Sequence, residues 1–103
     1  MKKAGKSKDR SSYYETLPNK IVDTEARYRK IIGDNLKAIR EYHGWSQLQA
    51  AEMTGIHRTR ISELENGRWS STMLTLIQIS SAYGVTVESL LDRGTKGKYE
   101  SKA

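Results

Sequence analysis

The chain has 103 residues, and its 18 Lys and Arg exceed its 12 Asp and Glu, which gives a net charge of +6 at pH 7. This length fits one domain with tails, and 36% apolar residues leave no material for a second core. The chain has no Cys, which excludes disulfides, thiolate zinc sites and cysteine nucleophiles. Because no apolar run follows the charged start, we expect neither a signal peptide nor a membrane anchor. We therefore expect a soluble cytoplasmic protein whose positive charge favours an anionic partner.

The excess positive charge lies at the two ends of the chain. Residues 1–10 carry five positive charges and one negative, whereas residues 31–91 carry five positive and six negative. We divide the chain into a basic, flexible arm over 1–22, a folded domain over 23–91 and a basic tail over 92–103. The first ten residues are either a solvated tail or an arm that adds phosphate contacts to a nucleic-acid complex.

A long helix is predicted after Pro18, with Asp23 or Thr24 as its cap. Its apolar face repeats at intervals of three and four, through Tyr28, Ile32, Leu36, Ile39 and Tyr42. Gly33 lies inside this pattern, which fits one long helix with a weak point or a short lead-in joined to a second helix; we favour the long helix. His43 and Gly44 end it.

Two short helices are predicted next. Ser46 and Gln49 have the spacing of a capping box, and Gly55 can end the helix that they start. The following helix begins at His57 or Arg58 and ends at Asn66, before another glycine.

Two further helices complete the pattern. The first starts at residues 70–72 and ends at Gly84, with an expected inward face of Met73, Leu76, Ile77, Ser80 and Tyr83. Thr86 caps the second, in which Val87, Leu90 and Leu91 can pack. Without useful strand alternation, the chain is predicted to be all-α, a five-helix bundle of about sixty residues.

The segment over 46–66 reads as helix, tight turn and helix, which can present the second helix to a groove. On a helical wheel Ile61 and Leu64 point to the core. The outward face is polar, with Thr59, Ser62, Glu63 and Asn66, and with Arg58 and Arg60 on its flanks. An α-helix fits the major groove of B-DNA, where Arg pairs with guanine and Thr contacts thymine. The same wheel also fits a solvated helix or a protein-interaction module.

Several segments together resemble the Cro and phage-repressor type, or XRE-type, helix-turn-helix family. The matching stretches lie within 32–40, 45–47, 51–56, 61–68 and 82–91, and they cover about sixty residues in register over five helices. The resemblance implies a lambda-repressor-like fold and sequence-specific binding to double-stranded DNA. It also implies a transcriptional regulator, expected to be a nucleoid-associated repressor that binds inverted repeats as a homodimer, although activation is compatible with the same residues.

The resemblance also implies residue roles. The base-reading residues would be Arg58, Thr59, Ser62 and Glu63. The residues on the DNA backbone would be Ser46, Gln47, His57, Arg60, Asn66, Gly67 and Arg68, with Gln47 also bracing the recognition helix and Arg60 on either a phosphate or a base. Arg40 and Glu65 would form a structural ion pair. Leu74, Ile77 and Leu91 are apolar beyond what the core needs, and we expect them at the dimer interface.

The chain departs from the family pattern at Leu48, Ala50, His57 and Ser71. His57 replaces the usual cap and would either fray the recognition helix or reach a phosphate. Trp69 would either stack on the DNA backbone or cover the core.

Other chemistry lacks the residues it needs. His43 and His57 are the two histidines, they lack HExxH spacing, and no nucleophile with a positioned base or phosphate-binding glycine loop occurs. We therefore expect no enzyme activity, metal, cofactor or small-molecule ligand. The alternative function is a protein-interaction adaptor or antitoxin-type module on the same fold.

Overall fold

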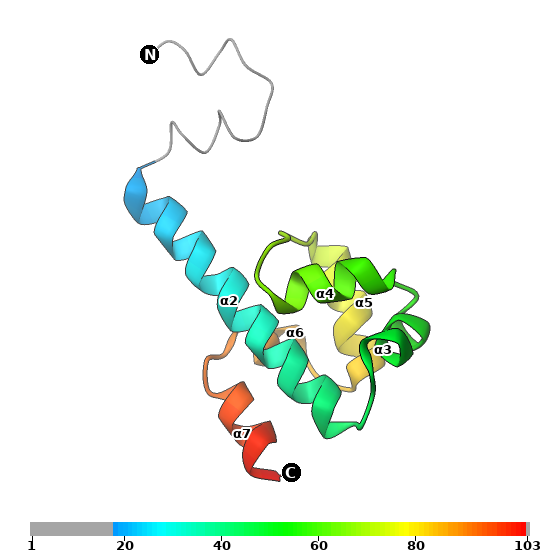
Figure 1. Ribbon diagram of the computed structural model, residues 1–103. Helices are drawn as coiled ribbons and strands as arrows, with labels where there is room; N and C mark the ends of the chain where they lie inside the picture. Colours follow the sequence, from blue (N-terminus) through cyan, green and yellow to red (C-terminus); the bar gives the residue numbers. More distant parts are fainter. Residues whose placement is uncertain (1–17, 103) are drawn as a thin grey trace.

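The computed structural model describes residues 18–102, which form six helices and no strand (Figure 1). The helices are α2 (Asn19–Tyr42), α3 (Gln47–Thr54), α4 (Arg58–Glu65), α5 (Met73–Tyr83), α6 (Val87–Leu91) and α7 (Thr95–Lys102). The all-helical prediction is confirmed, with one helix more than expected. The basic segment over 1–10, for which two roles were considered, lies outside the described residues.

Helix α2 is the longest element and starts earlier than predicted. It begins at Asn19, because Pro18 has a φ of −57° and its carbonyl accepts from the amides of Ile21 and Val22. Thr24, expected as a cap, lies inside the helix and donates its hydroxyl to the Lys20 carbonyl. The helix continues through Gly33, so the preference for one long helix is confirmed. Its first half projects beyond the other helices, whereas its second half is surrounded by them (Figure 1).

The predicted caps define the next helices. Ser46 and Gln49 form the capping box, with amide-to-side-chain distances of 2.8 and 3.1 Å. Gly55 ends α3 with a φ of +77°, which a residue with a side chain rarely adopts. Thr72 and Thr86 cap α5 and α6 through their hydroxyl groups.

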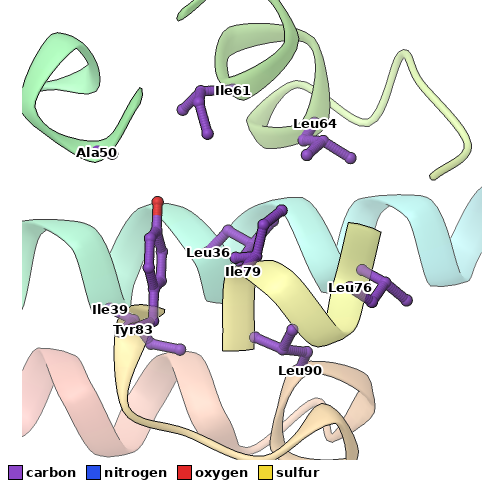
Figure 2. Close-up of a cluster of buried hydrophobic side chains, with 9 residues drawn as sticks. All are labelled: Leu36, Ile39, Ala50, Ile61, Leu64, Leu76, Ile79, Tyr83 and Leu90. Carbon is purple, nitrogen blue, oxygen red and sulfur yellow. The ribbon is translucent and has the colours of Figure 1, made fainter. Parts of the chain in front are cut away.

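The core gathers nine buried side chains from five helices (Figure 2). They are Leu36 and Ile39 of α2, Ala50 of α3, Ile61 and Leu64 of α4, Leu76, Ile79 and Tyr83 of α5, and Leu90 of α6. The predicted inward face of α5 is partly wrong, because Met73 and Ile77 are 60% and 45% exposed while Ile79 is fully buried. Ile77 lies off the buried face formed by Leu76, Ile79, Ser80 and Tyr83, whereas Met73 continues the spacing of that face but is the first residue of the helix.

The segment over 92–103, predicted as a tail, contains helix α7, which packs against α2. Thr95 is buried, and its hydroxyl donates to the Ser89 carbonyl over 2.6 Å. Tyr99 meets Tyr42 of α2 edge to face, with ring centroids 5.2 Å apart. The side-chain amide of Asn35 donates to the carbonyls of Leu90 and Asp92, which fixes the chain between α6 and α7. The many charged residues of this segment led to the prediction of a tail, although Thr95 and Tyr99 dock α7 against the rest of the fold.

Candidate nucleic-acid interface

The turn between α3 and α4 is fixed by hydrogen bonds around Thr54. The Thr54 hydroxyl donates to the Ala50 carbonyl over 2.7 Å and accepts from the Ile56 amide over 3.1 Å. The Gln78 side chain of α5 donates to the Thr54 carbonyl. Because the last residue of α3 is tied to both the turn and α5, these hydrogen bonds restrain the end of α3 relative to α5 and to the turn that leads into α4.

His57 caps the start of α4 by its ring. Its Nδ1 accepts from the Thr59 amide over 3.1 Å, which satisfies one of the unpaired amides of the first turn. The expectation of a frayed helix start is therefore wrong. The other ring nitrogen, Nε2, is left on an exposed side chain.

The inner face of α4 is anchored by an ion pair between Arg40 of α2 and Glu65. Arg40 Nε lies 2.6 Å from Glu65 Oε2, its Nη2 donates to Oε1 over 3.0 Å, and its Nη1 donates to the Trp45 carbonyl. Gln47 of α3 donates to Glu65 Oε1 over 3.0 Å. The hydrogen bond to Glu65 raises the pKa of the Arg40 guanidinium above its usual value. Helices α2, α3 and α4 are thus joined at one buried carboxylate.

Gly33 lets α2 and α4 approach closely beside this pair. A Cβ at position 33 would collide with the Leu64 carbonyl oxygen and would lie 2.8 Å from that of Glu65. Since both obstacles are backbone atoms, no rotamer change relieves them. Sequence reasoning treated Gly33 as a weak point of the helix, whereas the residue is a packing requirement.

The outer face of α4 is polar and accessible. Arg58 and Thr59 are exposed, and Arg58 has no hydrogen bond or ion pair within residues 18–102. Ser62 and Glu63, one turn later, are half-buried. Arg60 pairs with Glu63 over 2.9 Å, and its guanidinium carbon lies 4.7 Å from the centre of the Trp69 ring. The four residues expected to read bases therefore share one accessible face.

The end of α4 uses most of its own donors. The amides of Asn66, Gly67 and Arg68 donate to the carbonyls of Ser62, Leu64 and Glu63, and the Asn66 side chain donates to Ser62 as well. Arg29 of α2 donates from Nε to the Gly67 carbonyl over 3.2 Å. Arg68 is exposed, and its guanidinium makes no hydrogen bond or ion pair within residues 18–102, so it is the group at this end that can reach an anion.

The sequence did not indicate the role of Arg29, and of the two roles considered for Trp69 the structure shows packing against the core. Arg29 of α2 binds the Gly67 carbonyl. Trp69 packs against the core, and the Arg60 guanidinium lies over its ring. The one available signal for Arg29 is its position a helical turn before Gly33, on the side of α2 that meets α4.

The apolar residues expected at a dimer interface lie on the surface of α5 and α6. Leu74, Ile77 and Leu91 are 76%, 45% and 39% exposed. Within residues 18–102, no three His, Asp or Glu side chains gather as a metal site would require. Over the same residues, no helix combines the length and apolar character needed to cross a bilayer.

Comparisons with known proteins agree with this geometry. A family profile described as helix-turn-helix matches residues 36–90. The chain is 35% identical to the control protein C.SmaI of Serratia marcescens over 65 residues, which cover 63% of this chain and 77% of that protein. It is 29% identical over 69 residues to the immunity repressor of Bacillus phage phi105, which covers 67% of this chain and 48% of the repressor. The crystal structure of a hypothetical transcription factor from Neisseria aligns with a TM-score of 0.62 and 31% identity, over 66% of this chain and 78% of that one.

Proposed function

The chain belongs to the Cro/C1-type, or XRE-type, helix-turn-helix family of DNA-binding transcriptional regulators, which are not enzymes, and from this premise we propose that it is a cytoplasmic, nucleoid-associated repressor that binds inverted repeats as a homodimer. The observation that carries the proposal is the accessible polar face of α4, held from behind by the buried Glu65 network. A helix fixed in this way can enter the major groove without first being ordered.

In the proposed complex, Arg58 and Thr59 read bases at the start of α4, and Ser62 and Glu63 read bases one turn later. Arg58 suits this role because it is exposed and has no partner among residues 18–102, so its guanidinium is available to donate two hydrogen bonds to a guanine. Thr59 can place its methyl group on a thymine.

Backbone phosphates are proposed to lie at both ends of the helix-turn-helix. At one end, the start of α3 offers the hydroxyl of Ser46 and the Gln47 side chain, with His57 Nε2 at the following turn. At the other end, Arg68 offers an exposed guanidinium beside Asn66 and Gly67. Contacts of this kind set the register of the protein on the duplex, whereas base contacts set its specificity.

Leu74, Ile77 and Leu91 are proposed to meet the same residues of a second copy. Their exposure on adjacent helices α5 and α6 supports this, because a two-fold interface must be self-complementary. Sedimentation of Leu74→Asp tests the interface, with Met53→Asp as the matched control, since Met53 is 54% exposed on α3. We expect Leu74→Asp to be monomeric and Met53→Asp to remain dimeric; equal behaviour of the two variants contradicts the assignment.

The proposed function is tested by selecting bound sites from random duplex DNA at two salt concentrations. An enriched inverted repeat, with half-site centres about 34 Å apart, is the expected result. Binding without enrichment that is lost at the higher salt concentration contradicts it, because charge alone then holds the DNA. The protein-interaction alternative would then take its place.

A further inference from the structure

Arg60, Glu63 and Trp69 form a cluster at the edge of the proposed reading face, which we call the Arg60 cluster. The Arg60 guanidinium lies between a carboxylate and an aromatic face, 2.9 Å from Glu63 Oε1 and 4.7 Å from the Trp69 ring centre. Both contacts restrict the same side chain, which is 51% exposed. Arg60 is thus held by two neighbours although it lies at the surface.

The Trp69 ring is a fixed support for Arg60. Trp69 is half-buried and packs against the core cluster. The loop that carries it is tied to the rest of the fold, because the Arg68 amide donates to the Glu63 carbonyl and Arg29 donates to the Gly67 carbonyl. The ring therefore restrains the Arg60 side chain, and Arg60 in turn restrains the Glu63 carboxylate.

A carboxylate on a DNA-reading face requires a counter-charge. Phosphates repel it, but a neighbouring guanidinium offsets this repulsion. Arg60 donates a hydrogen bond to Glu63 Oε1, whereas Oε2 has no hydrogen-bond partner within residues 18–102. A free carboxylate oxygen in the major groove accepts from the N4 amino group of cytosine.

We propose that Glu63 reads a cytosine in each half-site and that Trp69, acting through Arg60, is the positioning residue that holds Glu63 in place. The proposal rests on the proposed function, since it needs α4 in the major groove. In this proposal Trp69 acts without contacting a base. Arg60 is then the link between the Trp69 ring and the Glu63 carboxylate, and not an independent DNA contact.

Site selection with the full chain tests the proposal through base preference at one position. Glu63→Gln should change the preferred base at that position from cytosine to adenine, because Gln pairs with adenine, and should shift the ratio of the two by about tenfold. Trp69→Ala should lower the preference for cytosine at the same position by about two- to fivefold, the loss expected for a surface cation–π contact. Trp69→Phe, which keeps an aromatic face, should preserve most of the preference.

Two controls separate this result from a general loss of structure. Arg60→Gln breaks the link without removing a core side chain and should weaken preference at the same position as Trp69→Ala. Arg68→Ala should weaken binding to all sequences alike. Circular dichroism melting curves show whether each variant is folded at the temperature of the selection.

The outcomes distinguish a failure of the proposed function from a failure of this inference. If the wild type enriches no sequence, the proposed function fails. If the wild type enriches a repeat, but Trp69→Ala and Arg60→Gln change either no position or all positions equally, the Arg60 cluster is packing alone and the inference is overturned. A cytosine preference that survives Glu63→Gln overturns the assignment of that base to Glu63.

Discussion

Helix α4 supplies the carboxylate of two Arg–Glu ion pairs, one on each of its faces. The inner pair, Arg40 with Glu65, has a separation of 2.6 Å and side chains that are 10% and 4% exposed. The outer pair, Arg60 with Glu63, has a similar separation of 2.9 Å, but its side chains are 51% and 38% exposed. The inner carboxylate also accepts from Gln47, and the inner guanidinium also donates to the Trp45 carbonyl.

Burial and additional hydrogen bonds, and not the separation of the charged groups, decide what each pair does. Removing one partner from a buried pair leaves an uncompensated charge, whereas an exposed pair is solvated with or without its partner. The inner pair therefore holds the fold in one arrangement. We expect the fold to depend little on the outer pair, which leaves its side chains available for binding.

Replacing each glutamate by alanine should affect the stability of the fold very differently at the two pairs. Glu65→Ala should destabilise the fold by about 3–5 kcal/mol, because Arg40 stays buried without its carboxylate. The matched change Glu63→Ala should alter stability by no more than about 1 kcal/mol. Urea denaturation followed by circular dichroism measures both. Similar losses for the two variants would show that exposure does not separate the pairs.

Gly33 tests the inner face without a charge. Gly33→Ala should cost about 1–3 kcal/mol, because the added methyl group meets the carbonyls of Leu64 and Glu65 and α4 must move. Gly97→Ala on α7 is the matched control, since a Cβ there has nothing within 4 Å and alanine favours the helix. Denaturation midpoints should therefore move in opposite directions. A stabilised Gly33→Ala variant would contradict the close contact of α2 with α4.

A substitution of Arg58 tests DNA binding by the outer face of α4. Arg58→Ala should leave the denaturation midpoint unchanged, because Arg58 is exposed and contacts no partner in the described part of the chain. It should weaken binding to the selected site by about 1–3 kcal/mol and relax preference at one base position. Fluorescence anisotropy with the site and its single-base variants provides the measurement. An equal loss on every sequence would remove Arg58 from the base-reading residues.

The smallest expected change concerns Arg68. Arg68→Ala should weaken binding to all sequences alike and lower the slope of log affinity against log salt by about 1, as expected for one lost phosphate contact. Titrations of the selected and a scrambled duplex at several salt concentrations measure this slope. A loss confined to the selected duplex would assign Arg68 to a base instead.

Local signals predicted most of the fold. The capping box at Ser46 and the glycine at position 55 mark the bounds of α3 because their effects act within one helical turn. The pairing of Arg40 with Glu65 followed from the family resemblance, and the ion pair is present. Signals of this kind do not depend on how distant segments pack.

Contacts between distant segments were harder to predict. Without the position of α4, Gly33 is predicted to weaken the helix. Without the contact between Tyr42 and Tyr99, the segment of α7 is predicted to be a charged tail. The exposed outer face of α4 followed from a helical wheel, but the support of Arg60 by Trp69 could not, because it joins a helix to a loop. Any base preference would depend on the DNA partner and leaves no trace in the packing of the chain.

The two halves of α2 also differ in how their backbone can open. Residues 19–31 include no buried side chain, whereas Gly33, Asn35, Leu36 and Ile39 are buried against other helices. Backbone amide hydrogens before Arg29, whose side chain holds the Gly67 loop, should therefore exchange with solvent through fraying that leaves the bundle intact. Those around Gly33 should exchange only when α4 separates from α2, so that one unbroken helix reports both the local and the global opening of the molecule.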